Sequence, residues 1–519
     1  MASTAKAAVW IMIATMLSKV LGFFREVVLA SFYGTGAYAD VFLLTLNIPG
    51  LIIAIVGSAI ATIYVPIYFE TKEKEGTEGA LKFTNNMINI IALLAIVVAI
   101  LGLLFTEEFV KVFAVGFTGE KFRIAVSFTK IMIIGVIFLA LSKIFGTYLN
   151  VNDSFTVPSL IGIPYNIFII SAIAISTKTN VIIMAIGALL GMASQMLFQL
   201  PFAIKKGYKY KPYLNIKEEN IKNMIILMLP MIIGVAIGQI NTAVDKALAT
   251  TLGDGPLSAL NYANKLNDFV MALFVTSIVT VIYPKLARMI NADKKEDFVN
   301  TIVKSSNCIL LLVLPITVGA IVLAEPIVRI LFQRGAFDAE STNMTYNALR
   351  LYSLGLAAMG VRDVITRVFY SLSDTKTPMI NASIALIMNI IMNLILIKPF
   401  GYRGLAISTS IASIVTVMLL FRSLKKRTGY FGGDKIVKTG LKSLVSSVIM
   451  GVCTIFVYKG MYGILGAGMI NELLALVCSV VVSVVVYFIL IMILKVEEMS
   501  LVLDMVNKTK SKFIKNKGE

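Results

Sequence analysis

The chain has 519 residues, of which 58% are hydrophobic and 15% charged, and its mean hydropathy is +0.87. No ordinary soluble domain has this composition, so we predict an all-α polytopic membrane protein. The formal net charge of +18 would suit nucleic-acid binding, but the lysines and arginines alternate with apolar runs, so no nucleic-acid partner is expected.

The first apolar run, at 8–32, contains charges where hydrocarbon is expected, in the stretch 18–26 (SKVLGFFRE). Each buried charge costs roughly 2.5–3.5 kcal/mol and persists mainly when it faces a protein interior or a wet cavity. Lys19 lies roughly 17 Å from the start of the run, too deep for easy snorkelling. Arg25 and Glu26 point about 100° apart on a helix and form a polar wedge. A functional cavity is therefore favoured over a snorkelling pair with an internal salt bridge.

Apolar run length predicts about fourteen membrane spans. The first six lie at 8–32, 38–68, 85–105, 122–149, 155–176 and 181–204. The next six lie at 221–252, 257–287, 299–324, 343–372, 376–397 and 403–422. Two more lie at 437–458 and 468–494.

The loops differ in positive charge. One side collects the basic groups within 72–82, 205–217, 285–295, 422–435 and 508–517. A bias of about three to one over the other side is a positive-inside signal. We therefore predict a multi-pass protein of the cell membrane with both termini in the cytoplasm.

Three short patterns recur about 220 residues apart. They are 62–66 with 280–284, 153–158 with 374–378, and 205–206 with 425–426. Six spans separate equivalent points, so we predict two pseudo-symmetric six-helix lobes with the same orientation. The predicted division is an N-terminal lobe at 1–210, a C-terminal lobe at 211–430, and two extra transmembrane helices with a basic cytoplasmic tail at 431–519. Two such lobes around a central site are typical of a rocking transporter.

A second charged group lies in the eighth span, where Asn261, Asn264, Lys265 and Asp268 share one helix face. Lys265 is in the span equivalent to the one that carries Asp40, so both lobes would bring charge to a common centre. Three other intramembrane cations have no assigned partner: Lys130, Lys143 and Arg350.

A possible monovalent cation site combines Asp245 with Asn389, Asn393 and Thr409. Carboxylate, amide and hydroxyl oxygens suit a hard cation, and Na⁺ would then be the coupling ion. Interhelical hydrogen bonds explain these residues equally well, and both interpretations stay open.

Five motifs resemble those of the MurJ (MviN) lipid II flippase family. They are the stretch 18–26, the segment 34–40 with Gly34-Thr35-Gly36 and Asp40, 262–266 (YANKL), 332–337 (FQRGAF) and 374–378 (DTKTP). The similarity covers the first twelve spans in order. It implies the fold of the multidrug/oligosaccharidyl-lipid/polysaccharide exporter superfamily, with fourteen spans and two lobes around a cavity.

The resemblance also implies the substrate-binding residues. These are Lys19, Arg25 and Lys265 as cavity cations, with Glu26, Asp40, Asn264 and Asp268 beside them. The family's arginine in the second span falls at about Ile53 here, so the cavity is expected to be less cationic. That departure leaves room for a relative that handles another lipid-linked oligosaccharide, such as a spore-coat or capsule flippase.

The predicted function is lipid II transport from the cytoplasmic to the outer leaflet by alternating access. Lysine and arginine are suitable phosphate partners, and the polyprenyl tail of lipid II or a similar polyprenyl-diphosphate-linked saccharide stays among membrane lipids. Membrane potential or a cation would drive it, since no Walker A motif is present. A drug/cation antiporter of the same superfamily is an alternative, although it would favour acidic and aromatic cavity residues.

No enzyme activity and no resident cofactor are expected. The chain has no histidine and no obvious paired acidic motif, which a membrane glycosyltransferase or acyltransferase would need. Its three cysteines, Cys308, Cys453 and Cys478, have no paired spacing, so neither a disulfide framework nor a metal site is expected.

Overall fold

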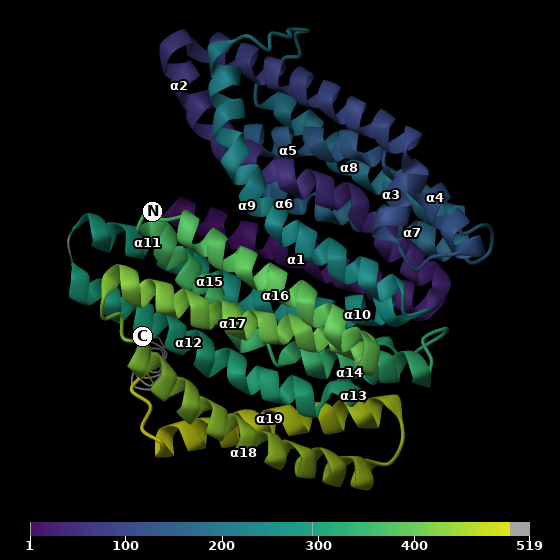
Figure 1. The fold of residues 1–519 in the computed structure, drawn as a ribbon, viewed down its shortest axis with the longest axis vertical. Helices are drawn as coiled ribbons and strands as arrows, with labels where there is room; N and C mark the ends of the chain where they lie inside the picture. The colour runs from purple at the N-terminus through teal and green to yellow at the C-terminus, as the bar shows by residue number, and fades with distance from the viewer. Residues whose placement is uncertain (1, 293, 499–519) are drawn as a thin grey trace, which may run out of the picture. The chain divides into compact units, whose positions relative to one another are not determined.

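The structure is a computed structural model that describes residues 2–292 and 294–498, apart from the side chains of 2–9 and of parts of 56–61, 219–234 and 291. The described residues form nineteen α-helices and one π-helical turn and no strand, which confirms the all-α prediction (Figure 1). Within them, ten helices are long and apolar enough to cross a membrane, or eleven with one bent pair. The count of about fourteen spans stays a prediction.

The chain divides into two compact units. Unit 1 contains Met1–Asn261 and Arg334–Ser341, and unit 2 contains Tyr262–Gln333 and Thr342–Glu519. The predicted division at 210 and 430 therefore stays a prediction.

The spans predicted separately at 38–68 and 85–105 lie in one helix of unit 1, α2 (Ala37–Leu104), so that boundary is wrong. The helices from α1 to α9 lie in this unit. They are α1 (Ala2–Tyr33), α2 (Ala37–Leu104), α3 (Thr106–Phe113), α4 (Gly119–Met132), α5 (Gly135–Val151), α6 (Thr156–Leu160), α7 (Gly162–Ser176), α8 (Ile182–Lys205) and α9 (Glu219–Thr250). The long α2 holds Pro49 and Pro66 and is broken at Gly76, whose φ of 70° suits glycine. The bent pair is α4 with α5, at 40°.

Buried tyrosines form the centre of unit 1. Tyr64 and Tyr68 of α2 stack with ring centroids 5.6 Å apart, and Tyr148 of α5 meets Tyr68 edge-on at 6.2 Å. The Tyr64 hydroxyl is hydrogen-bonded to Thr84 Oγ1 at 2.7 Å. Because this polar group is satisfied, the aromatic surface packs α2 against α5 without an orphaned hydroxyl.

The connector between α8 and α9 (residues 206–218) is held on α2 by three asparagines. Asn86 Nδ2 donates to the Asn215 carbonyl at 2.9 Å, and Asn86 Oδ1 accepts the Asn215 N–H at 2.8 Å. Asn85 and Asn89 donate to two further carbonyls of the connector, each at 2.9 Å. Side-chain amides therefore replace secondary structure as the partners of this backbone.

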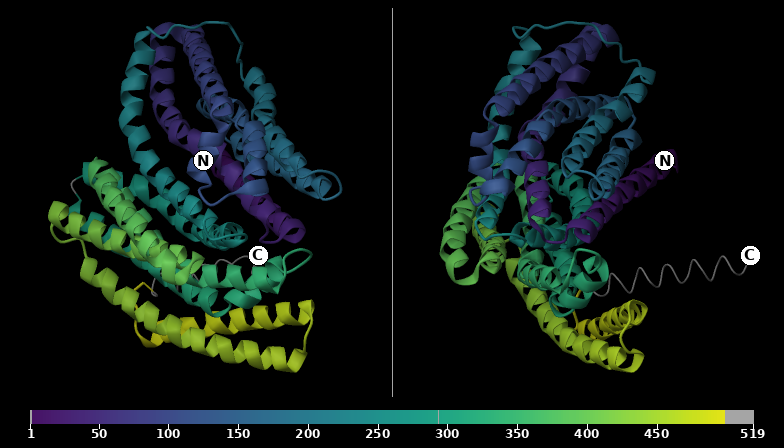
Figure 2. Two further views of the ribbon diagram at one scale, coloured as in Figure 1. Left: turned by 45° about the vertical axis from the view of Figure 1, so that its right-hand side comes forward. Right: turned by 90° about the vertical axis from the view of Figure 1, so that its right-hand side faces the viewer.

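Unit 2 contains the remaining helices and the ends of two that begin in unit 1. They are α10 (Pro256–Val270), η1 (Met271–Val275), α11 (Thr276–Asn291), α12 (Lys295–Val322), α13 (Ala324–Phe332), α14 (Ala339–Ser353), α15 (Leu356–Ser371), α16 (Lys376–Phe400), α17 (Tyr402–Thr428), α18 (Gly433–Leu465) and α19 (Met469–Ile493). In both views of Figure 2, α18 and α19 lie side by side, and α18 also packs on α12. Hydroxyl pairs such as Ser443–Tyr487 and Thr454–Ser483, at 2.7 and 2.5 Å, join α18 to α19.

The internal repeat extends to the backbone. Asp153 after α5 and Ser373 after α15 have φ values of 57° and 58°. In each case the next residue donates its N–H five residues back, from Ser154 to Leu149 and from Asp374 to Phe369, both at 2.9 Å. The two predicted motifs at 153–158 and 374–378 are thus the same turn between paired helices.

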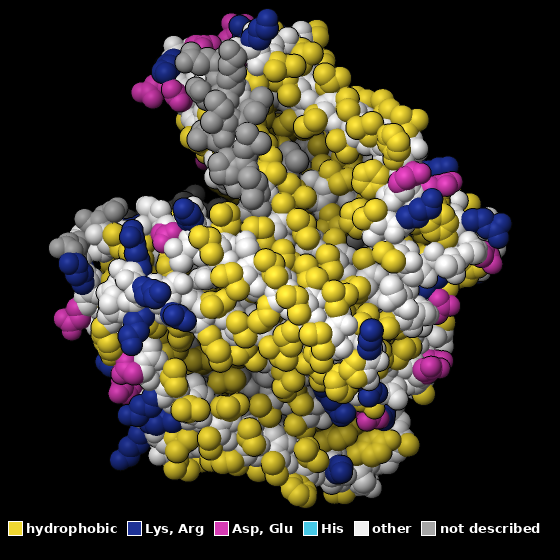
Figure 3. All heavy atoms as spheres, in the orientation of Figure 1, with side chains coloured by type: hydrophobic (Ala, Val, Ile, Leu, Met, Phe, Trp, Pro, Cys, Tyr) yellow, Lys and Arg dark blue, Asp and Glu magenta, His cyan; other side chains and the backbone are white. Residues whose placement is uncertain are grey.

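The surface of unit 2 has the distribution expected of a membrane protein. Hydrophobic side chains cover much of the visible face of α16 to α19, and lysine and arginine gather where α17 ends and α18 begins (Figure 3). Large apolar side chains of α18 and α19, such as Phe456 and Ile470, are exposed to more than 70%. Such a face is stable in lipid and not in water.

Candidate functional site

The charged stretch of α1 contains a short ion pair. Arg25 Nη2 lies 2.6 Å from Glu26 Oε1, and the two side chains are 14% and 1% exposed. Arg25 Nη1 also donates to Asn166 Oδ1 of α7 at 3.3 Å, and the guanidinium lies over the Tyr165 ring at 5.7 Å. Gly22 lies beside this amide, and a Cβ there would make an ordinary contact with Asn166 Nδ2 at 3.7 Å. The positive charge of Arg25 is therefore neutralised locally.

The second oxygen of Glu26 is used as well. Glu26 Oε2 accepts a hydrogen bond from Asn261 Nδ2, in the second turn of α10, at 3.2 Å. The buried carboxylate thus joins α1 to α10 within unit 1, which is why a full charge is tolerated among apolar helices. The sequence places Asn261 on the polar face of the eighth span but does not identify Glu26 as its partner.

Lys19 stands apart from this network. It is exposed, and the structure gives its ammonium no hydrogen bond or ion pair with any described residue. The preceding residue, Ser18, donates to the Ser159 carbonyl of α6 at 2.8 Å, so this turn of α1 is fixed on α6. The backbone is held while the lysine side chain stays available to a ligand.

The predicted charges of the eighth span lie in unit 2. Lys265 Nζ is 3.2 Å from Asp268 Oδ2, with side chains 39% and 54% exposed, and Asn264 is also exposed. Such an exposed pair on one helix contributes little to stability, so it is easily exchanged for another partner. The common centre predicted for the two lobes stays a prediction.

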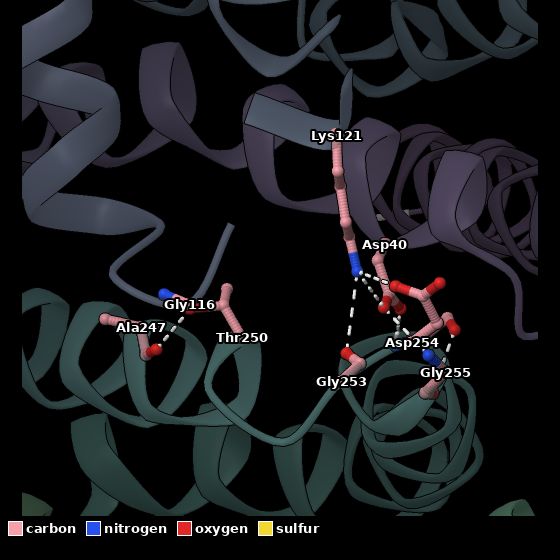
Figure 4. Close-up of polar contacts among 9 residues, drawn as sticks. Asp40, Gly116, Lys121, Ala247, Thr250, Gly253, Asp254 and Gly255 are labelled. Carbon is pink, nitrogen blue, oxygen red and sulfur yellow. Dashed lines mark hydrogen bonds and ion pairs between the residues drawn. The ribbon is translucent and has the colours of Figure 1, made fainter. Parts of the chain in front are cut away.

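Asp40 belongs to a buried cluster at the start of α2. Its Oδ2 accepts the N–H of Gly255 at 2.9 Å and its Oδ1 accepts the N–H of Ser258 at 2.8 Å, so it caps the N-terminus of α10 (Figure 4). Lys121 Nζ lies 3.0 Å from Asp40 Oδ2 and 2.6 Å from Asp254 Oδ1. The Asp40 carboxylate therefore links the start of α2, the start of α4 and the N-terminus of α10. The assignment of Asp40 to substrate binding stays a prediction.

Two glycines tighten the same region. Gly116 donates its N–H to Thr250 Oγ1 at 3.0 Å, and a Cβ there would lie 2.1 Å from the Thr250 carbonyl oxygen (Figure 4). Gly335, with φ +58°, would place a Cβ 2.2 Å from the Ser31 carbonyl oxygen, and Ala336 N–H donates to that oxygen at 2.8 Å. The loop after α3 thus packs closely on the end of α9, and the loop after α13 packs in a similar way on the end of α1. Sequence reasoning includes Gly335 in the motif 332–337 without its contact, and it missed Gly116 and Lys121, since their partners are distant in the chain.

Ile53, at the position of the family's second-span arginine, is buried and 7% exposed. A cation nevertheless lies close to it. A Cβ on Gly57 would be 3.2 Å from Lys143 Cγ and 3.6 Å from Ile53 Cγ2, so the α5 lysine crosses α2 beside Ile53. The sequence gives no signal for this contact, which depends on the packing of α5 on α2.

The predicted cation-site residues are distributed over both units. In unit 2, Asn389 and Asn393 of α16 are buried, and Asn393 Nδ2 donates to Asn389 Oδ1 at 3.0 Å. Thr409 Oγ1 of α17 donates to the Leu405 carbonyl at 3.0 Å. Asp245 lies on α9 in unit 1, so the four-residue set stays a prediction.

An apolar cavity of about 500 Å³ lies in unit 2 between the main helices and the α18–α19 pair. Its walls come from α10, η1, α12, α13, α14, α18 and α19, with side chains such as Phe269, Pro315, Met450, Val484 and Phe488. A cavity of this chemistry accepts hydrocarbon and excludes charge.

Comparison with protein families gives one assignment. The family model described as Lipid II flippase MurJ matches residues 29–474. The Probable lipid II flippase MurJ of Haemophilus influenzae is 32% identical over 84% of this chain and 89% of its own length. The corresponding protein of Vibrio cholerae is 31% identical over 79% and 81%.

Solved structures agree. One described as Lipid II flippase MurJ, inward closed conformation, is 28% identical and superposes with a TM-score of 0.81, covering 95% of this chain and 100% of that one. An inward-facing multidrug resistance MATE family transporter of the MOP superfamily is 13% identical, with a TM-score of 0.68 over 81% of this chain and 98% of that one. The second similarity shows a shared fold alone.

Proposed function

Since the chain belongs to the lipid II flippase MurJ family, we propose that it moves lipid II from the cytoplasmic to the outer leaflet of the cell membrane. The observation that carries the proposal beyond family membership is Lys19, which lies within the apolar helix α1 and whose ammonium has no partner among the described residues. A diphosphate is the ligand that such a charge suits best. The step makes and breaks no bond, so we propose a transporter and not an enzyme.

The Asp40 cluster supports a gating role at the predicted outer end. It ties the start of α2, the start of α4 and the N-terminus of α10 through a single buried carboxylate. While these hydrogen bonds hold, that end is closed, and the head group would enter from the cytoplasmic side. Release of the Asp40 carboxylate would then free the outer end for discharge of the substrate.

The apolar cavity of unit 2 suits part of the polyprenyl tail. At about 500 Å³ it has room for several isoprene units, and its wall beside α18 and α19 is almost entirely hydrocarbon. The two extra helices would thus guide the tail while the head group is handled by charged residues. The two helices α18 and α19, which have no counterpart in the internal repeat, would thus have a function of their own.

Energy would come from the membrane potential or from sodium. The oxygen donors of Asn389, Asn393 and Thr409 fit a hard monovalent cation in kind, and Asp245 would supply the negative charge. Cytoplasmic termini, as the loop charges predict, would place the positively charged loops on the side where lipid II is made.

A flippase for another lipid-linked oligosaccharide is the second candidate. Ile53, in place of the family's arginine, is the observation that favours it. Depletion in the native cell separates the two candidates: a lipid II flippase causes lipid II to accumulate in the cytoplasmic leaflet, whereas the alternative causes a different polyprenyl-linked saccharide to accumulate.

A reconstituted assay tests the proposal directly. Proteoliposomes containing the full chain and fluorescent lipid II should expose the label to an impermeant quencher faster than protein-free vesicles. Lys19→Ala should reduce the rate at least about tenfold, since a charge-assisted contact contributes about 1.5–3 kcal/mol. A wild-type protein that moves no lipid II, or a Lys19→Ala variant at the wild-type rate, would overturn the proposal.

A further inference from the structure

Lys143 lies at the middle of α5, a helix of seventeen residues packed between α2 and α8. Roughly eight residues separate it from the end of the helix, about 12 Å at 1.5 Å per residue. It is exposed, although Ser142 and Ile144 on either side are buried. A lysine ammonium at this depth is costly unless it meets water or a counter-charge.

The ammonium of Lys143 has no such counter-charge among the described residues. It has no ion pair, cation–π contact or side-chain hydrogen bond; its backbone carbonyl alone is used, by Thr147 Oγ1 at 2.9 Å. By contrast, Arg25 and Lys265 each have an acidic neighbour. Among the described side chains of α1 and α5, Lys19 and Lys143 are therefore the cations without a counter-charge.

Gly57 sets the course of the Lys143 side chain. Because residue 57 has no side chain, the lysine crosses α2 there, with its Cγ and Cδ 3.2 and 3.5 Å from where a Cβ would stand. The aliphatic stem is thus packed on α2 and beside Ile53, while the ammonium extends beyond it. The aliphatic part of the side chain is therefore fixed by packing, and the ammonium has no partner among the described residues.

The short helix α6 contacts both α1, which carries Lys19, and α5, which carries Lys143. Gly146, three residues after Lys143, would place a Cβ 3.8 Å from Pro158 of α6. The next residue of α6, Ser159, accepts the hydrogen bond of Ser18, which precedes Lys19. Both lysines therefore lie on helices that contact α6 within unit 1.

We infer that Lys143 is a substrate-binding residue, which together with Lys19 binds the diphosphate of the transported lipid. The inference rests on the proposed function and adds a cation that neither the sequence motifs nor the family resemblance assigns. Two lysines on helices that contact the same short helix suit a ligand with two adjacent phosphoryl groups, each neutralised by a point charge. No bond is made or broken.

The first test is binding of farnesyl diphosphate, a soluble probe that has the prenyl diphosphate without the sugar, to the full chain in nanodiscs. Lys143→Met keeps the stem on Gly57 and removes the charge, and its affinity should fall at least about tenfold. Lys143→Arg keeps the charge and should bind within about threefold of wild type. Farnesol, which has no phosphate, should bind all three proteins equally.

The second test moves the charge from α5 to α2. Because Ile53 and Lys143 meet over Gly57, Ile53→Arg in the Lys143→Met background should recover most of the affinity and the transport rate. Ile53→Leu in the same background should not. Lys130→Met is the matched control, since Lys130 is an exposed cation on α4 with no described partner, and it should bind like wild type.

The third test is accessibility. A cysteine at position 143, with Cys308, Cys453 and Cys478 replaced by serine, should react with a charged thiol reagent, and farnesyl diphosphate should slow that reaction. Lys143→Gln provides a second neutral variant, checked with the others for size-exclusion profile and melting temperature.

The outcomes separate the two proposals. The inference would be overturned if the wild-type protein transports lipid II and binds the diphosphate and the Lys143→Met variant does both equally well. It would also be overturned if a cysteine at 143 does not react. Either result would leave the proposed function intact. A wild-type protein that neither binds the diphosphate probe nor moves lipid II would overturn both. Loss in Lys143→Met with recovery by Ile53→Arg would establish the charge, not the packing, as the contribution of Lys143.

Discussion

Replacing Asp40 by asparagine should release the outer-end cluster. The Asp40 carboxylate is fully buried and accepts the N–H of Gly255, just before α10, the N–H of Ser258 in α10 and the Lys121 ammonium, at 2.8–3.0 Å. Asparagine keeps one acceptor oxygen but turns the other into a donor that faces a donor. The substitution also removes the buried ion pair of Lys121, whose remaining acidic partner is the exposed Asp254. Breaking a buried pair in this way costs about 3–5 kcal/mol.

This cost converts into a change in the gate equilibrium. Every 1.4 kcal/mol is a factor of ten, so the ratio of closed to open protein should fall by about a hundred- to a few-thousand-fold. Asp254→Asn is the matched control, because the Asp254 side chain is 62% exposed and its pair with Lys121 is largely screened. An exposed pair contributes about 0–1 kcal/mol, so the control should change the ratio less than about sixfold.

Cysteine labelling measures this equilibrium. Ala259 of α10 lies one residue after Ser258 and is fully buried. In a background without the native cysteines, Ala259→Cys should react slowly with an impermeant maleimide added outside, and Asp40→Asn should speed the reaction in proportion to the open population. Equal rates with and without Asp40→Asn, or an equally large effect of Asp254→Asn, would refute the gating role of the carboxylate.

Three further predictions concern stability, pH and coupling. Asn86→Leu should lower the free energy of unfolding by about 1–3 kcal/mol in a denaturant titration, since the partly buried connector backbone loses its partners. Asn347→Leu, which removes hydrogen bonds to Asn343 one turn before on the same helix, should change it little. Burial acts to raise the pKa of Asp374, in the turn before α16, but hydrogen bonds from the Thr377 N–H and hydroxyl outweigh it and lower that pKa. The stability from Asp374 is thus present above its unfolded pKa of about 3.9 and lost as pH falls through the folded value, so the melting temperature of Asp374→Asn should fall less than that of wild type on acidification below about pH 4. Asp245→Asn should weaken any sodium dependence of transport in proteoliposomes while insertion is normal, and unchanged ion dependence would assign Asp245 to packing.

Much of the helical architecture could be predicted, because apolar runs of the right length leave a helix as the structure in which lipid-buried backbone is satisfied. The helix boundaries at charged loops could not be predicted. The sequence predicts separate spans at 38–68 and 85–105, whereas α2 continues through residues 69–84. Its residues there are strong helix formers, and Lys74 pairs with Glu70 one turn before at 2.7 Å, so the helix interrupts itself at Gly76 alone.

In the candidate site, too, a contact within one helix could be predicted from the sequence, whereas contacts between distant segments could not. The charges of 18–26 and the Lys265–Asp268 pair follow from residue spacing, and the structure places them as spaced. Adjacent helical residues point about 100° apart, so spacing does not predict that the guanidinium of Arg25 reaches back to Glu26. Lys121 and Lys143 depend on partners 81 residues before and on a glycine of another helix, which periodicity cannot reveal.

The balance of charge on α1 and α5 gives these contacts a common meaning. Among the described side chains of these two helices, Lys19, Arg25 and Lys143 set three positive charges against the one negative charge of Glu26, a net excess of two. An excess of that size within membrane helices is stable only when hydrated or neutralised by a ligand. A diphosphate that links a lipid to a sugar has one ionised oxygen on each phosphoryl group, about −2 in all, and neutralises it. The pair of Arg25 with Glu26 would then keep the free charge low enough to match the substrate, so Glu26→Gln should strengthen diphosphate binding and slow release, whereas faster release from that variant would contradict the charge argument.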